Sequence, residues 1–253
     1  MDFLAVLLSE TNMQIVIAVV FITGIVRGFS GFGSGMIIGP TTAAFYGPTV
    51  ALPLLSIVDA LPTIPLVWQA RKQFSWSDVL PVVIGYAVLI PLGVWVLKTS
   101  DASALRWFIS ISILVAVSIL WSGWKYTGPR NTAISASVGA MGGFMGAAAA
   151  LPGPAVLIYW LASSAKAARV RANMIYYLFL TDILVMIGYF IGDIYTWNAF
   201  WRAMLCIPGY LTGIAIGTRF FKGASEATYR RVAFIMIFIA AISSLPILDT
   251  ILR

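Results

Sequence analysis

Residues 28–40 read GFSGFGSGMIIGP, lie between two apolar runs and directly follow the charged residue Arg27. The four glycines in the first eight residues disfavour a continuous helix, because each interior glycine costs roughly 1 kcal/mol relative to alanine. Pro40 also removes a backbone hydrogen-bond donor. The stretch therefore predicts a helix that ends near Phe29 and a second, shorter helix that begins near Gly33. Close packing of neighbouring helices through small residues is the alternative explanation for these glycines.

The composition of the chain is that of a membrane protein. Of its 253 residues, 60% are hydrophobic and only 10% are charged, whereas soluble domains carry about 25% charged residues. The mean hydropathy is +0.95, and no polar stretch is long enough for a soluble domain. We therefore predict an all-α polytopic membrane protein, in which a helix break must be surrounded by protein or by a water-filled cavity.

Two residue counts exclude whole classes of site. The chain has no histidine and a single cysteine, Cys206. These counts exclude histidine-ligated metals and haem, a Ser-His-Asp triad, a histidine proton relay and a disulfide within the chain, and they argue against a cysteine metal site. We expect no cofactor, no metal and no nucleic-acid partner. The N-terminus lacks a basic region, so we do not expect it to be an ordinary cleaved signal peptide.

The apolar segments divide the chain into helices of unequal length. Residues 1–13 are expected to form an interfacial lead-in. The predicted helical segments cover residues 14–29, 32–46, 50–69, 79–97, 103–121, 133–144, 155–162, 172–191, 199–220 and 227–248.

The second half of the chain repeats features of the first. Residues 28–31, GFSG, correspond to residues 143–146, GFMG, and Asp59 corresponds to Asp182, each about midway along its helix. Four further pairs share one offset: Tyr86, Gly93, Lys98 and Arg106 match Tyr210, Gly217, Lys222 and Arg230. The pattern predicts two repeats, 1–125 and 126–253, that together form one transport domain.

Charge placement predicts that the two repeats are inverted. Each repeat has five helical segments, including a broken or re-entrant hairpin, and an odd number reverses the direction of the second repeat. With both termini outside, most loop-end Lys and Arg residues fall inside, as the positive-inside rule requires. This topology accounts for the net charge of +7 without a polyanionic partner.

Inverted repeats with broken helices are typical of secondary transporters, whose substrate sites lie near the bilayer midplane beside the breaks. A half-helix beginning near Gly33 or Ala148 directs free N–H groups and a positive dipole end at the site. Glycine lets a ligand approach that backbone closely, so we expect a small anionic substrate. The residues expected to bind it are Arg27, Ser30, Gly31, Gly33, Ser34, Gly35, Gly146, Pro152, Gly153 and Tyr159.

Several of these residues have a structural alternative. Arg27 could instead extend to the membrane interface, and the two serines could hydrogen-bond back to their own helix. Tyr159 could belong to an interfacial aromatic belt. Asp59 and Asp182 are expected to couple transport to protons or to serve a structural role, because carboxylates inside a membrane are costly and usually mark function.

The chain resembles the sulfite exporter TauE/SafE family of membrane permeases over nearly its whole length. The residues that carry the resemblance are 28–35 with Pro40, 143–154, PAVLIYWL at 154–161 and VRAN at 170–173. The resemblance implies two inverted halves and a bacterial inner-membrane transporter that usually exports sulfite, sulfoacetate or related sulfonates. The chain departs from the family pattern at Ser34, which interrupts a glycine run, and at residues 147–150, where alanines replace glycines.

These departures leave the identity of the anion open. The expected function is therefore export of a sulfur-containing anion, and the oligomeric state is not indicated. A carrier of small carboxylates such as oxalate is the alternative within transport, and an anion channel is a further one. An enzyme is not expected, because no nucleophile–base pair stands out, although Asp59 and Asp182 could in principle form an aspartyl pair.

Overall fold

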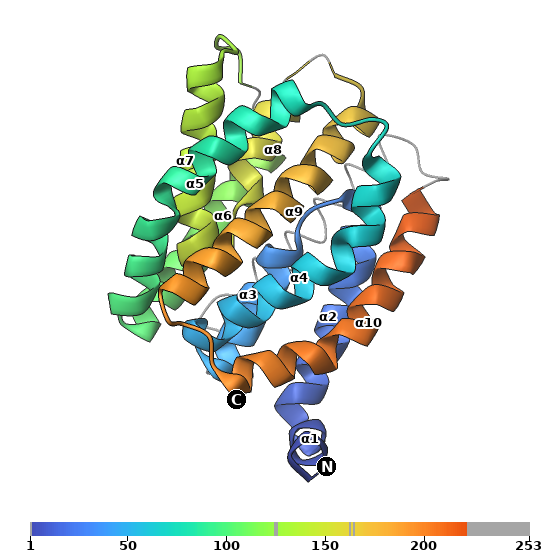
Figure 1. Ribbon diagram of the computed structural model, residues 1–253, viewed down its shortest axis with the longest axis vertical. Helices are drawn as coiled ribbons and strands as arrows, with labels where there is room; N and C mark the ends of the chain where they lie inside the picture. Colours follow the sequence, from blue (N-terminus) through green and yellow to red (C-terminus); the bar gives the residue numbers. More distant parts are fainter. Residues whose placement is uncertain (1, 124–125, 162, 164, 222–253) are drawn as a thin grey trace.

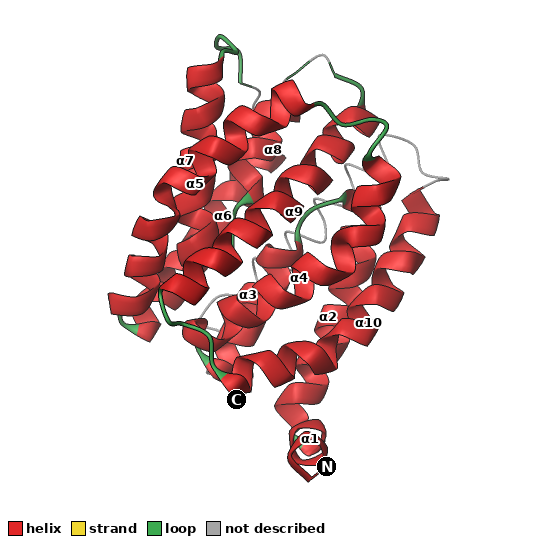
Figure 2. Cartoon of the chain, in the orientation of Figure 1, coloured by secondary structure: helices red, strands yellow, loops and turns green. Residues whose placement is uncertain are grey.

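The computed structural model describes residues 2–123, 126–161, 163 and 165–221. Within these residues the chain forms ten helices and no strand (Figures 1 and 2). The helices are α1 (Asp2–Ser9), α2 (Thr11–Ser30), α3 (Ser34–Tyr46), α4 (Pro48–Ala70), α5 (Trp76–Thr99), α6 (Ala102–Trp121), α7 (Thr132–Ala149), α8 (Gly153–Leu161), α9 (Ala167–Ile191) and α10 (Trp197–Phe221).

Six of these helices, α2, α4, α5, α7, α9 and α10, are long and apolar enough to cross a membrane. The predicted all-α polytopic membrane fold is therefore confirmed. By contrast, α3 has 13 residues and α8 has nine, which gives lengths of about 20 Å and 14 Å at 1.5 Å per residue. A bilayer core is about 30 Å thick, so the pairs α2–α3 and α7–α8 are two broken hairpins whose second helix is too short to span.

The predicted boundaries hold for the first break but not for the second. Helix α2 ends at Ser30 and α3 begins at Ser34, each one residue beyond the prediction. Helix α7, predicted to end at residue 144, runs on to Ala149, so that end was wrong. Helix α8 begins at Gly153, two residues before the predicted segment 155–162, and the expected half-helix start near Ala148 was wrong. Alanine is the strongest helix former, which explains why the alanine run extends α7. The predicted segment at residues 227–248 lies outside the described residues.

Long helices from one predicted repeat pack against the broken hairpin of the other. Helix α5 lies along α7, and α10 lies along α2. Gly28 faces the backbone of Ile214, and Gly143 faces the backbone of Tyr86, so closely that a Cβ would overlap these atoms. Close packing through small residues is therefore the role of these two motif glycines. The inverted relation between the repeats stays a prediction.

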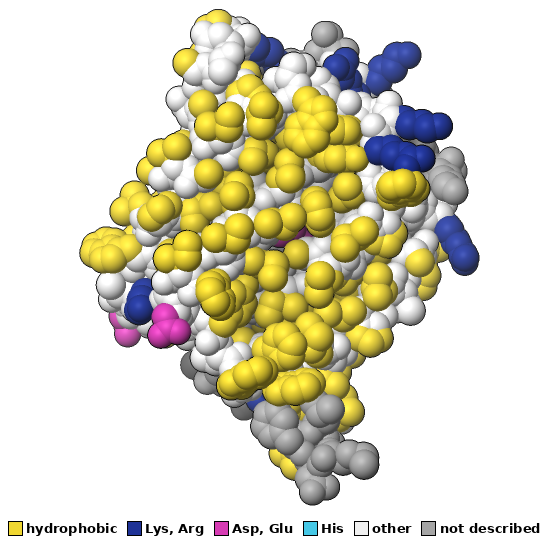
Figure 3. All heavy atoms as spheres, viewed as in Figure 1, with side chains coloured by type: hydrophobic (Ala, Val, Ile, Leu, Met, Phe, Trp, Pro, Cys, Tyr) yellow, Lys and Arg dark blue, Asp and Glu magenta, His cyan; other side chains and the backbone are white. Residues whose placement is uncertain are grey.

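The outer surface suits a lipid environment. Large apolar side chains such as Trp68, Val88, Trp95 and Phe190 are exposed, and apolar atoms cover the middle of the molecule in Figure 3. In this view most Lys and Arg side chains gather at the end where α4 and α10 terminate, while the opposite end shows acidic side chains together with a basic one. This is the charge separation on which the predicted topology rests.

Candidate functional site

The first break is built by two glycines in left-handed conformations. Gly31 has φ 79° and caps α2 by donating its N–H to the carbonyl of Arg27 at 2.8 Å, and Gly33 has φ 98°. Side chains other than glycine adopt this region only at a cost. The hydroxyl of Ser30 contacts the carbonyls of Val26 and Phe32 at 2.8 and 2.7 Å. Ser30 thus bonds back to its own segment, which was the structural alternative.

The second break ends differently, because an alanine occupies its left-handed position. Ala150 has φ 58° and its N–H donates to the carbonyl of Gly146 at 3.1 Å. Hydroxyls from α9 satisfy two further carbonyls: Tyr189 donates to Ala147 at 2.7 Å, and Tyr177 donates to Pro152 at 2.8 Å. These bonds supply the partners that freed backbone groups need inside a membrane.

The two breaks lie directly against each other. A Cβ placed on Gly35 would collide with the carbonyl oxygen of Ala150, and one on Gly39 would lie 3.1 Å from the Cβ of Ala150. Glycine at position 35 is therefore required by the approach of the two hairpins. The contact joins residues 115 positions apart, each at or next to its break.

A small cavity of about 40 Å³ lies where the breaks meet. By volume it holds two or three water molecules, at about 15 Å³ each. Its walls come from both breaks, α4, α5 and α9. Of the residues predicted from sequence, those that line it are Gly33, Ser34, Gly35, Asp59, Gly146, Pro152, Gly153 and Asp182. Those that do not are Arg27, Ser30, Gly31 and Tyr159.

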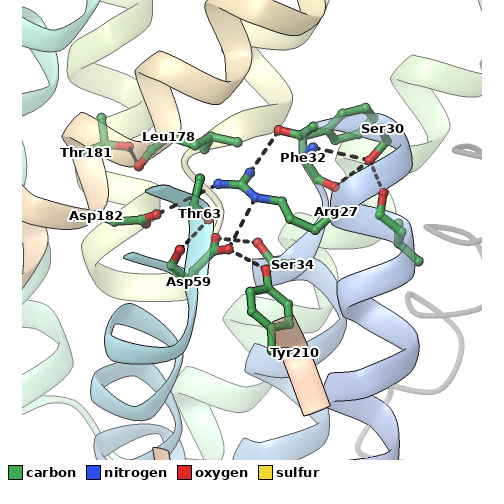
Figure 4. Close-up of polar contacts among 12 residues, drawn as sticks. Arg27, Ser30, Phe32, Ser34, Asp59, Thr63, Leu178, Thr181, Asp182 and Tyr210 are labelled. Carbon is green, nitrogen blue, oxygen red and sulfur yellow. Dashed lines mark hydrogen bonds and ion pairs between the residues drawn. The ribbon is translucent and has the colours of Figure 1, made fainter. Parts of the chain in front are cut away.

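Arg27 is fully buried beside this cavity, so its extension to the membrane interface was wrong. Its Nε lies 3.2 Å from Oδ1 of Asp59, and its Nη2 lies 4.0 Å from Oδ2 of Asp182. Its Nη1 donates to the carbonyl of Gly31 at 2.9 Å. Figure 4 shows the guanidinium between the two carboxylates and the first break. Arg27 therefore joins three segments that the sequence separates widely.

The two carboxylates have unequal surroundings. Asp59 accepts hydrogen bonds from the hydroxyls of Ser34, at 2.5 Å, and Tyr210, in addition to its ion pair with Arg27. Asp182 is 7% exposed, and its Oδ2 has no hydrogen-bond partner among the described residues. Asp59 is thus a fixed member of a buried network, whereas Asp182, which lines the cavity, has a buried oxygen that makes a 4.0 Å ion pair with Arg27 and no hydrogen bond among the described residues.

Sequence reasoning missed part of the cavity wall. Tyr86, Tyr189 and Ser56 line it, and Tyr210 binds Asp59 from α10. The repeat had paired two of these tyrosines without assigning them a role. A buried tyrosine needs a partner for its hydroxyl, which was the available signal. Tyr159 lies elsewhere, with its hydroxyl 2.9 Å from that of Ser135.

The described residues at the site do not include a cluster of side chains suited to binding a metal ion. Across the described parts of the chain, no three His, Cys, Asp or Glu side chains gather closely enough to hold one. The polar residues that line the cavity are Ser34, Ser56, Asp59, Tyr86, Asp182 and Tyr189.

Comparison of the sequence with models of known protein families shows which family the chain belongs to. A family model described as Sulfite exporter TauE/SafE matches residues 16–244. The chain belongs to the sulfite exporter TauE/SafE family. The match includes both broken hairpins and the charged cluster of this TauE/SafE protein, and the family is one of membrane transporters. Comparisons with curated proteins and with solved structures gave no match.

Proposed function

We propose that this TauE/SafE protein is a secondary transporter that exports small sulfur-containing anions, such as sulfite or organosulfonates, across the bacterial inner membrane. The carrying observation is the cavity formed where Gly35 and Ala150 bring the two broken hairpins together. Both chain ends lie outside in this proposal, and access alternates between the two sides of the membrane. Family membership supports the class of substrate.

Backbone dipoles give the cavity its preference for anions. Helices α3 and α8 begin at Ser34 and Gly153, and both residues line the cavity. No side chain caps the N-terminus of α3, so its first N–H groups are available to an anion. Arg27 is engaged by Asp59 and does not line the cavity. It holds the site together while the backbone contacts the substrate.

The net charge of the cluster links anion binding to a proton. With both carboxylates ionised, Arg27, Asp59 and Asp182 sum to −1. An anion about 5 Å from the extra charge is repelled by about 3 kcal/mol at an effective dielectric constant of 20, a factor of roughly 200 in affinity. Protonation of Asp182 removes this repulsion. Asp182 is therefore the proposed coupling residue, with Asp59 as the permanent partner of Arg27.

Counterflow in proteoliposomes tests the proposal. Proteoliposomes that contain the purified protein and are loaded with unlabelled sulfite should take up external [³⁵S]sulfite saturably, and faster than liposomes without protein. A parallel panel with a small sulfonate and with oxalate identifies the preferred anion. Large unitary currents would indicate a channel instead. Failure of every sulfur oxyanion and sulfonate to exchange would refute the substrate class.

A further inference from the structure

A second hollow of about 670 Å³ lies at the ends of helices and shares no lining residue with the cavity. It is bounded by the first turns of α5, α7 and α9 and by the end of α8. We call it the basic pocket. The residues that define it here are Asp78, Arg130, Ser135, Tyr159, Lys166 and Arg169.

The charges of the basic pocket do not cancel. Asp78 forms an ion pair with Arg169 at 3.6 Å and accepts a hydrogen bond from the side-chain amide of Asn173 at 3.1 Å. Arg130 donates to the carbonyl of Tyr159 at 3.0 Å, a bond that leaves its charge in place. Lys166 makes no ion pair within the described part of the chain. Two positive charges therefore remain uncompensated within one concave pocket.

Helix ends add to this positive potential. Three helices begin at the pocket, and each N-terminus carries a partial positive charge. Asn131 caps α7 through its side chain, but no side chain caps α9, which starts after Lys166. The hydroxyls of Ser77, Thr132 and Ser135 also line the pocket. Positive charges, hydroxyl donors and free helix ends are the groups that bind oxyanions in proteins.

We propose that the basic pocket is a second anion-binding site, for an oxyanion group of sulfur or phosphorus. Either a soluble sulfur oxyanion or the phosphate of an anionic lipid headgroup carries this chemistry. The pocket lies at the membrane end that the charge pattern predicts to be cytoplasmic. It is joined to the cavity by α8, whose first residues line the cavity and whose Tyr159 and Trp160 line the pocket.

Equilibrium dialysis of [³⁵S]sulfate against the full chain in uncharged detergent tests the second site independently of transport. The variant carries Arg130→Gln and Lys166→Gln. Its control carries Arg71→Gln and Lys72→Gln, two exposed cations that do not line the pocket. We expect the wild type and the control to bind sulfate at a class of sites that the variant weakens at least tenfold, since two charges are lost.

Addition of phosphatidylglycerol micelles separates the two sources of the oxyanion. Displacement of sulfate from the wild type by this lipid, but not by phosphatidylcholine, assigns the pocket to a lipid headgroup. Retention of sulfate assigns it to the soluble anion. Equal sulfate affinity and equal retention of phosphatidylglycerol in variant and wild type would overturn the proposal. A failure of counterflow alone would leave the pocket standing and would count only against the transport function.

Discussion

Replacing each central aspartate in turn with asparagine should give different results, because the two carboxylates differ in their partners. Asp59→Asn removes the carboxylate 3.2 Å from the buried guanidinium of Arg27 and leaves only Asp182, at 4.0 Å. Removing one member of a buried ion pair costs about 3–5 kcal/mol. At about 2–4 °C per kcal/mol, the melting temperature should fall by roughly 10 °C.

Asp182→Asn leaves the Arg27–Asp59 pair intact and makes the cluster neutral. The melting temperature should change little. Relative to the wild type with Asp182 ionised, the variant should bind the anion up to about 200-fold more tightly, since a repulsion of about 3 kcal/mol is removed. Flux driven by a pH gradient should be lost in this variant, while counterflow persists.

Thermal unfolding in detergent and transport in proteoliposomes, each as a function of pH, measure these effects. Asp193→Asn is the matched control, because Asp193 is exposed and adopts φ 53°, which asparagine tolerates. Equal losses of stability in the two central variants would refute the assigned division of roles. Undiminished gradient-driven flux in Asp182→Asn would remove its coupling role.

Three further predictions concern the first break, the buried network around Asp59 and an ion pair that does not line the cavity. Gly33→Ala and Gly47→Ala should each lose about 1–2 kcal/mol of stability, because both glycines have positive φ and space for a Cβ. Only Gly33 lines the cavity, so counterflow should fall in Gly33→Ala and not in Gly47→Ala. Equal losses of transport in the two variants would favour a packing role for Gly33. Tyr210→Phe should lower the melting temperature by a few degrees through loss of a buried hydrogen bond to a carboxylate, and an unchanged melting temperature would contradict this. The hydrogen bond and charge of Arg202 lower the pKa of Glu10. The free energy of unfolding of the wild type should therefore exceed that of Glu10→Gln by under about 1 kcal/mol near pH 7, and this difference should vanish as the pH falls below about 4 and Glu10 is protonated. A difference in melting temperature that stays constant down to pH 3 would contradict this prediction.

The local chemistry of the chain made the first break predictable. Gly31 and Gly33 adopt positive φ, which glycine tolerates and which a glycine-rich run therefore signals. The second break was placed too early, because Ala150 takes the equivalent left-handed conformation without a glycine to mark it. The backbone between α7 and α8 is set instead by tertiary hydrogen bonds from tyrosines on α9.

The partners of charged residues could not be read from their positions. Arg27 lies near the end of α2, where an arginine often reaches the interface, yet it binds Asp59 on α4 and approaches Asp182 on α9. The sequence identified both aspartates as notable but gave them equal weight. Their difference arises from Ser34 and Tyr210, which the fold brings to only one of them.

Thiol accessibility of the cavity tests most directly whether the two breaks form a substrate site with alternating access. Gly153→Cys, where a Cβ meets only Met174 and Leu178 at 3.5–4.0 Å, is introduced with Cys206→Ala, and Gly47→Cys serves as the control. Membrane-impermeant methanethiosulfonate reagents are applied from each side, with or without a transported sulfonate, which does not consume them. The account predicts modification of position 153 from both sides that saturating sulfonate slows, with no protection at position 47. A modification rate at position 153 that saturating sulfonate leaves unchanged would contradict it.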